Sequence, residues 1–338
     1  MLKVALIGAS HWHSKFYYEP LAELETAQLC AVSDPNPMVA RTLGEQLQRP
    51  WFTDYRDLLE DMRPDFVFAL GQHAEMPDIG QDLIDAGVAF ALEKPCGVSY
   101  AQVAGLRDSA AAAGVFAAVP LAFRSSRLLR EIQQIADGSR FHHLSFRFIA
   151  GTPQRYLDAG CSWMLDRDKA GGGCTINLAV HFFDLFALLT REAPRVVGAE
   201  MSNASYGLAV EDYSAVLLSG GGASGVVETG YTLPAPTSEF DLRFSLRSER
   251  HYFTATGADP VGPDRMVVHQ IEGGNQVIHI PVSQVPHYRD FVFETLDSFR
   301  QGRPPVAGLD EMCAAMRVVE SAYARGLGRP TNEKGTGQ

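Results

Sequence analysis

Short apolar runs alternate with amphipathic segments over the first 120 residues of the chain. The runs end at turn residues, and they are KVALIGAS, QLCAVSDP, PDFVFAL, VAFALEKP and VFAAVPL. Between them, segments such as PMVARTLGEQLQ and MPDIGQDLIDAG place apolar residues at helical spacing. Strands that alternate with helices form βαβ units, so this pattern predicts a doubly wound parallel sheet over residues 1–122. The nearly continuous apolar character of the runs is typical of strands covered on both faces.

The pattern changes after residue 123, where apolar and polar residues alternate with a period of two. The alternating runs are HHLSFRFIAG, RVVGAEMSNA, YSAVLLSGG, ASGVVETGYTL, FDLRFSLRSER, HYFTATGA, RMVVHQIEG and NQVIHIPV. They predict a large, mainly antiparallel sheet that is open on one face. Helical patterns interrupt or follow it at TINLAVHFFDLFALLTRE, YRDFVFETLDSFRQG and LDEMCAAMRVVESAYARG. We therefore expect an α+β domain over 123–330 and a loose polar tail over 331–338.

Composition narrows the class of protein. The chain has 338 residues, of which 46% are hydrophobic and 20% charged, which is typical of a globular protein with a sizeable core. Its net charge of −11, with Lys and Arg scattered along the chain, disfavours nucleic acid and anionic membrane surfaces as partners. Neither a signal sequence nor a run of about 18 apolar residues is apparent, so we predict a cytoplasmic protein.

The cysteines do not form a metal-binding or disulfide pattern. The five cysteines make no C-x-x-C pair and are odd in number. This usage favours reduced thiols over a disulfide framework, and it disfavours a zinc site. No metal is expected.

The turn LIGASHWHS follows the first apolar run, where a dinucleotide-binding protein carries the motif G-x-G-x-x-G. Only Gly8 is kept, and Ser10 and His13 stand where the other glycines would be. A helix beginning near Ser14 would offer N–H groups to a phosphate. We expect Ser10 beside the pyrophosphate, with His11 and Trp12 reaching toward the cofactor or the cleft. The alternatives are an ordinary loop or a metal-binding His pair, although no further ligand stands nearby.

Asp34 ends the second apolar run, in AVSDPNP. A carboxylate there can accept hydrogen bonds from the two ribose hydroxyls of an adenosine, and it repels a 2′-phosphate. The residue therefore favours NAD over NADP. The alternative is a structural role as a turn residue before Pro35 or as a helix cap.

Glu93-Lys94-Pro95 stands at the end of another apolar run. Ligands of open α/β sheets bind outside the carboxyl ends of the strands, which places Lys94 at the cleft. There its ammonium could hydrogen-bond a substrate hydroxyl, and partial burial would lower its pKa toward the working range. A lysine that merely ends a strand is the alternative.

Three glycines at 171–173 precede a helical segment that carries Asn177, His181 and Asp184. Spacings of four and three residues put these polar side chains on nearly the same stripe of a helix. A histidine satisfied within the core would explain His181 alone. The whole stripe is harder to explain structurally, because burying it carries a desolvation cost.

Together the degenerate nucleotide turn, E-K-P, the G-G-G helix with N-x-x-x-H-x-x-D and the two closing helices resemble the Gfo/Idh/MocA family. That family groups glucose-fructose oxidoreductase, inositol 2-dehydrogenase and rhizopine catabolism proteins. The resemblance covers nearly the whole chain. It implies an N-terminal Rossmann domain, a C-terminal domain whose open sheet forms a homodimer or homotetramer, and NAD(P)-dependent oxidation or reduction of a sugar or cyclitol hydroxyl.

By position, the resemblance implies that Lys94 is the catalytic lysine and His181 the acid/base histidine. Members commonly have Asp where Asn177 stands, and an Asn cannot take up a proton, so Asn177 would only orient the substrate or the imidazole. The resemblance also implies roles for flanking residues: Gln72, His73 and Glu93 beside the cofactor, and Arg124, Tyr156 and Trp163 against the substrate, with Arg155 in the same loop.

The sequence is also compatible with two other functions. The departures at Ser10, His13 and Asn177 would also suit an NAD-binding regulator or scaffold that has lost the chemistry. A metal-dependent hydrolase built on His11, His13 and His73 is a third hypothesis, which predicts that chelators abolish its activity.

Overall fold

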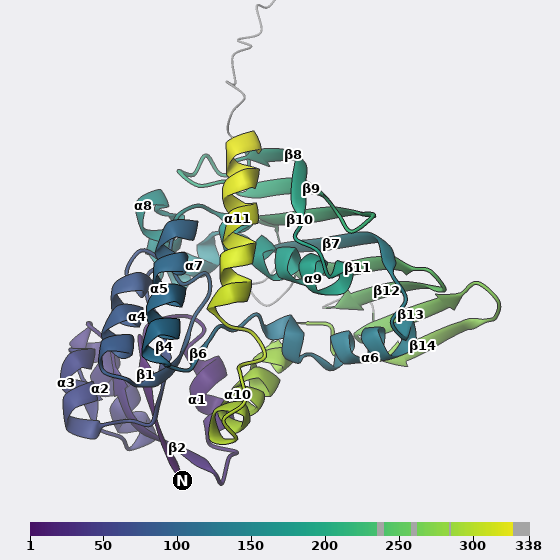
Figure 1. Ribbon diagram of the computed structural model, residues 1–338. Coiled ribbons are helices and arrows are strands. Elements are labelled where there is room, and N and C mark those ends of the chain that lie inside the picture. The colour runs from purple at the N-terminus through teal and green to yellow at the C-terminus, as the bar shows by residue number, and fades with distance from the viewer. Residues whose placement is uncertain (235–239, 258–261, 284, 327–338) are drawn as a thin grey trace, which may run out of the picture.

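The computed structural model describes residues 1–234, 240–257, 262–283 and 285–326, and Figure 1 shows their arrangement. Two sheets dominate it, one in each half of the chain. The tail expected over 331–338 lies outside the described residues.

The first sheet is parallel and doubly wound, as predicted. Its strands lie in the order β3-β2-β1-β4-β5-β6. Their bounds are β1 (Leu2–Ile7), β2 (Ala27–Ser33), β3 (Trp51–Phe52), β4 (Phe66–Ala69), β5 (Ala89–Leu92) and β6 (Ala117–Ala118). The crossing helices are α1 (Lys15–Leu21), α2 (Pro37–Leu47), α3 (Tyr55–Met62), α4 (Met76–Asp85) and α5 (Tyr100–Ala113). The order reverses beside β1, and a crevice at such a reversal is where ligands of this fold class bind.

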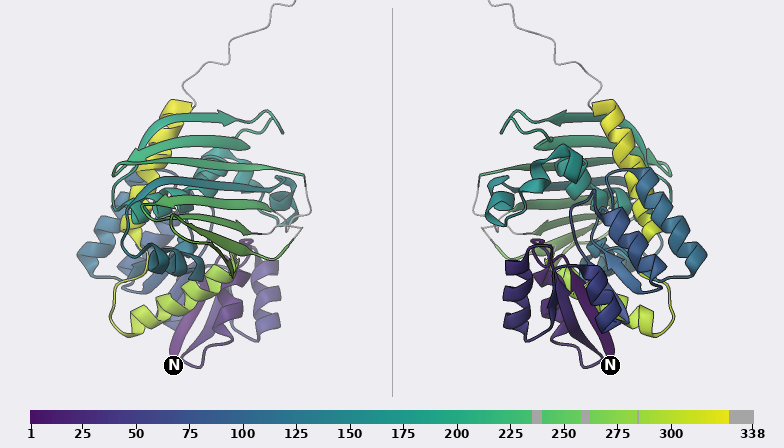
Figure 2. Two further views of the ribbon diagram at one scale, coloured as in Figure 1. Left: turned by 90° about the vertical axis from the view of Figure 1, so that its right-hand side faces the viewer. Right: turned by 90° about the vertical axis from the view of Figure 1, so that its left-hand side faces the viewer.

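The second sheet has eight strands in the order β14-β13-β12-β11-β7-β10-β9-β8. Their bounds are β7 (Phe141–Gly151), β8 (Arg195–Ser202), β9 (Tyr213–Gly220), β10 (Ala223–Leu233), β11 (Phe240–Ser248), β12 (His251–Gly257), β13 (Arg265–Gln270) and β14 (Asn275–His279). Only β7 and β10 pair in parallel, so the predicted mainly antiparallel sheet is confirmed. In the left view of Figure 2 its strands face the viewer, and most of the helices lie behind them.

Short helical segments connect the two sheets and cover the second. They are η1 (Ala122–Ser125), α6 (Arg127–Ala136), α7 (Gln154–Asp158), η2 (Ser162–Leu165), α8 (Arg167–Ala170), the π-helical turn η3 (Thr175–Ala179) and α9 (Val180–Thr190). The stretch Arg167–Thr190 is long and apolar enough to cross a membrane by composition, but 89% of its most apolar 18 residues are buried inside the protein. It is therefore a core helix, whose aromatic side chains such as Phe182 pack against the second sheet.

The chain ends with two long helices that return to the first sheet. Tyr288, Phe291 and Val292 of α10 (Val285–Arg300) share an apolar cluster with residues of β1, β2 and β4. Helix α11 (Leu309–Gly326) runs between α5 and the helices and strands of the second half (Figure 1). A segment that the sequence assigned to the second domain thus completes the core of the first.

Candidate active site

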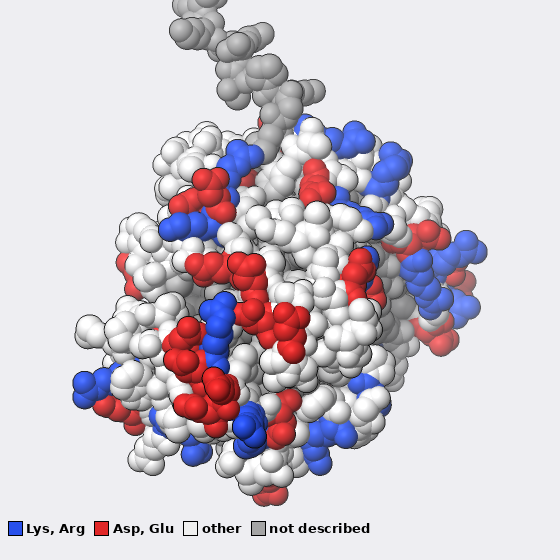
Figure 3. Space-filling model, turned by 60° about the vertical axis from the view of Figure 1, so that its left-hand side comes forward, with Lys and Arg blue, Asp and Glu red and all other residues white. Residues whose placement is uncertain are grey.

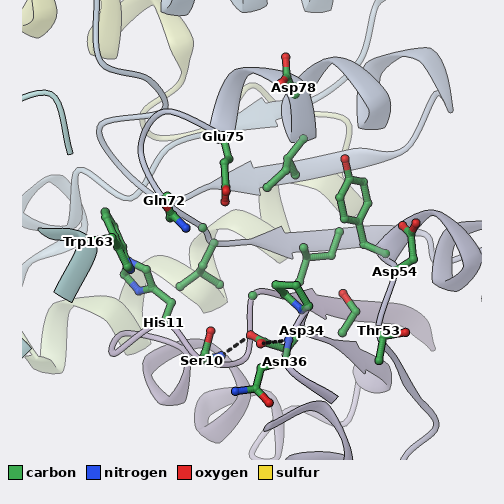
Figure 4. Close-up of a pocket in the computed structure, with 18 of the residues that line it drawn as sticks. Ser10, His11, Asp34, Asn36, Thr53, Asp54, Gln72, Glu75, Asp78 and Trp163 are labelled. Carbon is green, nitrogen blue, oxygen red and sulfur yellow. Dashed lines mark hydrogen bonds between the residues drawn. The ribbon is translucent and has the colours of Figure 1, made fainter. Parts of the chain in front are cut away.

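A cavity of about 560 Å³ opens at the carboxyl ends of β1, β2 and β4, where the strand order reverses (Figure 4). Five residues predicted to bind a cofactor line it: Gly8, Ser10, His11, Asp34 and Gln72. The position and the lining are those of a dinucleotide crevice.

Gly8 makes the turn after β1 possible. Its φ is +81°, and a Cβ at this position would lie 2.0 Å from the carbonyl oxygen of Leu70. A side chain is therefore excluded both by backbone conformation and by close approach of the next strand. Ser10 is exposed and lines the cavity, as a residue beside a phosphate would.

Asp34 combines the two roles that the sequence left open. Its carboxylate accepts hydrogen bonds from the backbone N–H groups of Ser10 at 2.6 Å and Asn36 at 2.9 Å (Figure 4). The bond from Asn36 closes the turn around Pro35, as one structural alternative predicted. The other alternative, a helix cap, does not apply to Asp34, because the residue that caps α2 is Asn36. A carboxylate offers about four lone-pair positions, and two are used here. Asp34 also lines the cavity, so it retains acceptor capacity for a ligand.

The start of α1 differs from the expectation for a phosphate-binding helix. The N–H of Ser14 donates to the carbonyl of His11 at 2.8 Å, and the N–H of Phe16 donates to the carbonyl of His13 at 2.8 Å. These bonds close tight turns of three residues, which satisfy N–H groups that a regular helix leaves open. The N–H groups at the start of α1 are therefore already bonded within the protein, whereas Ser10 lies exposed at the cavity.

A second cluster, fully buried, surrounds Lys94. Its ammonium donates to the backbone carbonyl and to the side-chain Oδ1 of Asn177, both at 2.7 Å. The Asn177 amide nitrogen donates in turn to the hydroxyl oxygens of Tyr156 at 2.7 Å and Tyr231 at 3.0 Å. Burial lowers the pKa of Lys94 from 10.5 to about 8, because water no longer stabilises the ammonium. The geometry fixes the orientation of the Asn177 side chain.

Glu93 points into a separate polar group formed by α1 and α10. Tyr17 donates to its carboxylate at 2.5 Å, His13 lies 3.3 Å from it, and the Tyr288 hydroxyl lies 3.4 Å from its other oxygen. Burial opposes ionisation of Glu93, but the neighbouring His13 and Lys94 hold its pKa below the usual range. The carboxylate is thus ionised and already satisfied by protein groups.

The histidines near these clusters are neutral over a wide pH range. Burial lowers the pKa values of His11 and His181 well below 6.5, and that of His73 to about 3. The N–H of His13 donates to Nδ1 of His11 at 3.1 Å, which leaves the proton of neutral His11 on Nε2. His73 Nδ1 lies 2.8 Å from the carbonyl of Ala170, so this ring carries its proton on Nδ1.

Within the described ranges, no three His, Cys, Asp or Glu side chains meet in a group that could hold a metal ion. His13 instead pairs with Glu93, and His73 with a backbone carbonyl. The metal-dependent hydrolase hypothesis therefore gains no support from these histidines.

The remaining predicted site residues divide between the two regions. Trp163 lines the cavity, and its ring lies 5.8 Å from that of His11 and 5.0 Å from that of His73. Trp12 does not line the cavity in this structure, and its ring packs edge-on against Tyr156 with centroids 5.5 Å apart. Glu93, Lys94 and His73 also do not line the cavity, and all three are buried.

Arg124, which the resemblance placed against the substrate, is engaged elsewhere. Its guanidinium binds both carboxylate oxygens of Asp184 at 2.7 and 2.8 Å. Asp184 is 4% exposed, so the pair holds η1 against α9 inside the protein. The polar residues predicted to share one stripe therefore contact two different regions. Asn177 contacts Lys94, and Asp184 contacts Arg124.

The glycines before Asn177 have a structural reason. A Cβ on Gly173 would lie 2.0 Å from the carbonyl oxygen of Glu211. The Glu211 carboxylate also accepts hydrogen bonds from the N–H groups of Gly173 and Thr175, both at 3.0 Å, and from the Tyr323 hydroxyl at 2.8 Å. The hydrogen bonds to the Glu211 carboxylate thus position the π-helical turn that carries Asn177.

Sequence reasoning missed four residues that support the two clusters: Tyr17, Glu211, Tyr231 and Tyr288. They lie on α1, in the connection between β8 and β9, on β10 and on α10, and none belongs to a motif with fixed spacing. Only the alternation in ASGVVETGYTL gave a hint, since it places Tyr231 on one face of its strand.

Fold and cavity together define an oxidoreductase with an NAD-binding Rossmann domain. Residues 2–120 match the model of the oxidoreductase family with an NAD-binding Rossmann fold, and residues 138–253 match that of the GFO/IDH/MocA C-terminal domain. The chain belongs to the Gfo/Idh/MocA family, which confirms the resemblance seen in the sequence. No individual curated protein matched the chain by sequence.

Solved structures share the fold over nearly the whole chain. An oxidoreductase from Agrobacterium radiobacter in complex with NAD⁺, L-tartaric acid and magnesium has a TM-score of 0.83 at 16% identity, covering 97% of this chain and 96% of that one. The WlbA dehydrogenase from Bordetella pertussis, with NADH and UDP-GlcNAcA, has a TM-score of 0.82 at 18% identity and 97% coverage of both chains. Aldose-aldose oxidoreductase from Caulobacter crescentus, with glycerol, has 0.81 at 19%, covering 97% and 98%.

Proposed function

We propose that this protein transfers a hydride between NAD(H) and a secondary hydroxyl or keto group of a sugar, a sugar derivative or a cyclitol. Lys94 and His181 act as the acid/base pair. The observation that carries the proposal is the buried ammonium of Lys94, which is fixed by two carbonyl oxygens of Asn177 at 2.7 Å next to a dinucleotide crevice.

The residues that line the crevice suit a dinucleotide. Gly8 allows the tight turn after β1 that borders the crevice, and Asp34 offers acceptors for ribose hydroxyls. Because a carboxylate repels a 2′-phosphate, Asp34 favours NAD over NADP. When bound, the nicotinamide accepts or donates the hydride. Gln72 and Trp163 line the same cavity, and we assign them to its nicotinamide side.

Lys94 holds the reacting oxygen of the substrate. An ammonium has three N–H donors, and two are directed at Asn177, so one remains for a substrate oxygen. Below a pH of about 8 the group is charged, and it stabilises the alkoxide character that develops as the hydroxyl proton leaves.

His181 moves the proton. Its pKa is lowered by burial, so the ring is neutral and able to accept the hydroxyl proton during oxidation. The same ring returns the proton during reduction. Asn177 cannot take a proton and keeps Lys94 in place.

Two substitutions test this assignment. We expect Lys94→Ala and His181→Ala each to lower turnover by about 10² or more, since general acid–base groups contribute at this level. NADH binding, followed by fluorescence, should stay unchanged in both variants. Full turnover in either variant would remove that residue from the mechanism.

A regulator or scaffold that binds NAD without chemistry is the second candidate. The absence of a proton-accepting group at Asn177 is the observation that favours it. A screen of sugars and cyclitols, read as nicotinamide absorbance, separates the two candidates: a regulator binds NADH and turns over no compound.

We also expect a cytoplasmic protein. It should form a homodimer or homotetramer through the eight-stranded sheet, and light scattering of the purified protein would test this oligomeric state.

A further inference from the structure

Arg155 is a cation without a carboxylate partner among the described residues. It lies on α7, half-buried, with its guanidinium over three aromatic rings: Trp12 at 5.3 Å, Tyr156 at 4.6 Å and Tyr231 at 5.3 Å. One of its terminal nitrogens donates to the Tyr156 hydroxyl at 2.5 Å. Its Nε is buried and has no hydrogen-bond partner within the part of the chain that the structure describes. A buried donor without a partner carries a free-energy cost that a bound ligand can remove.

A continuous set of hydrogen bonds connects Arg155 to the proposed reaction centre. Arg155 donates to Tyr156, Asn177 donates to the same hydroxyl at 2.7 Å, and Lys94 donates to Asn177 at 2.7 Å. The Tyr156 oxygen therefore accepts two hydrogen bonds, and its own hydrogen can only be donated onward. The neighbouring Tyr231 hydroxyl is hydrogen-bonded with Tyr156. Nε of Arg155 is therefore the donor of this network that has no acceptor within the described residues.

The charges in this region sum to a positive value. Lys94 and Arg155 contribute two positive charges, and the ionised carboxylate of Glu93, which lies beside Lys94, contributes one negative charge, so the three side chains sum to one positive charge. The protein as a whole is acidic, with a net charge of −11, and Figure 3 shows acidic side chains gathered across one face. A local excess of positive charge in an acidic protein favours an anionic ligand.

We propose that the substrate carries a carboxylate, which binds Nε and the guanidinium of Arg155 while a hydroxyl of the same molecule meets Lys94. The substrate class is then a sugar acid, such as a uronate or an aldonate. A guanidinium presents its N–H groups in a planar fork that matches the two oxygens of a carboxylate. Arg155 does not line the cofactor cavity, so its anion comes from the substrate and not from the cofactor pyrophosphate. This inference rests on the proposed function, because it places the carboxylate on the molecule that reacts.

The test compares hexuronates, the matching neutral hexoses and hexose 6-phosphates as substrates of the NAD-loaded protein. We expect kcat/KM for at least one hexuronate to exceed that of its neutral hexose by about 10- to 100-fold, the worth of a charge-assisted hydrogen bond pair. Arg155→Gln should remove this preference. Arg155→Lys, which keeps the charge and loses the fork, should retain part of it. Arg41→Gln, at an exposed arginine of α2 that pairs with Glu45 and does not line the cavity, is the matched control and should change nothing.

The possible results distinguish failure of the carboxylate site from failure of hydride transfer. Oxidation of neutral sugars with no dependence on Arg155 would overturn the carboxylate inference and leave hydride transfer intact. Hexuronate binding that depends on Arg155, measured by calorimetry without any turnover, would support the carboxylate site and refute hydride transfer. A preference for the 6-phosphates, or a tenfold loss of NADH affinity in Arg155→Gln, would show that Arg155 binds a phosphate and would overturn the inference. Melting temperatures of both Arg155 variants verify that they fold.

Discussion

The cofactor cavity and the cluster around Lys94 are connected through Trp12, whose ring lies 6.3 Å from that of His11 and 5.5 Å from that of Tyr156. The two regions differ in charge and in exposure. The cavity is open and carries carboxylates, among them Asp34, Glu75 and Asp78 (Figure 4). The cluster carries the buried cation Lys94, and the half-buried cation Arg155 lies at its side against Tyr156 and Tyr231. The open cavity thus presents hydrogen-bond acceptors, and the cluster presents hydrogen-bond donors. This contrast is what the proposed function predicts for a cleft that holds a hydroxyl-rich cofactor next to a substrate oxygen.

The two regions also differ in how the chain builds them. The cavity comes from the turns after β1, β2, β3 and β4 and from the segment 160–163, whereas the cluster takes Lys94 from the turn after β5 and side chains from α7, η3 and β10. Substitutions in the cavity can therefore act through the backbone of a turn as well as through a side chain, and substitutions in the cluster should act through individual side chains.

The largest effect should follow from Gly8→Ala. A left-handed conformation costs an L-residue about 1–2 kcal/mol, and the added Cβ would also lie 2.0 Å from a carbonyl oxygen. We expect the melting temperature to fall by several degrees and NADH binding to be lost. Gly105→Ala is the control, since Gly105 lies in α5 with open space around it and Ala is favoured in a helix by about 0.5–1 kcal/mol. Undiminished NADH affinity in Gly8→Ala would show that the cofactor does not bind at this turn.

An intermediate effect is expected from Asp34→Asn, which removes a charge from the open cavity. We expect about a tenfold loss of NAD affinity, the worth of one hydrogen bond to a charged group, together with a smaller preference for NAD over NADP. Asp78→Asn removes an exposed carboxylate from the same cavity and serves as the control. If both variants behave alike, general charge and not a contact to the ribose sets the preference. Isothermal titration with both cofactors gives the answer.

The smallest effect concerns the closed cluster and is a shift of a pH profile. Lys94 must be protonated to hold the substrate oxygen, so kcat/KM falls as the pH rises through its pKa of about 8. Asn177→Asp places a carboxylate against the ammonium, which favours the charged form and raises this pKa. We expect the basic limb to move upward by about one unit or more. The pKa of His181 is lowered by burial, so its ring should stay neutral as the pH falls below 6.5. We therefore expect the enzyme to remain active on the acid side.

Asn203→Asp adds the same charge at an exposed position and should leave the profile unchanged. An unmoved basic limb in Asn177→Asp would mean that another group, and not Lys94, controls the reaction at high pH.

The sequence predicted the fold because its periodicities are long and regular. Strand β3 was not among the predicted runs, since the two residues Trp51 and Phe52 are too few to show a period. The π-helical turn at 175–179 was read as regular helix, because apolar spacing does not distinguish a local widening of the helix. The elements were thus predictable, and their local irregularities were not.

The candidate site was predictable only in part. Residues in consecutive motifs, such as Gly8, Asp34 and Lys94, lie where the strand ends place them. The partner of Arg124 could not be inferred, because the choice between a substrate and Asp184 depends on how η1 docks on α9. The position of Tyr231 depends on the pairing of β10 with strands that are distant in sequence.

Tyr288 and its neighbours on α10 imply an order of events during synthesis. The first sheet is built from residues that leave the ribosome early, but its apolar cluster includes Phe291, Val292 and Leu296 from the last part of the chain. Domains usually fold in the order in which they are made. Here the N-terminal half must keep an apolar surface uncovered until α10 has been translated. A nascent chain halted before α10 should therefore bind chaperones through its first sheet, and a chain extended past α10 should no longer bind them there.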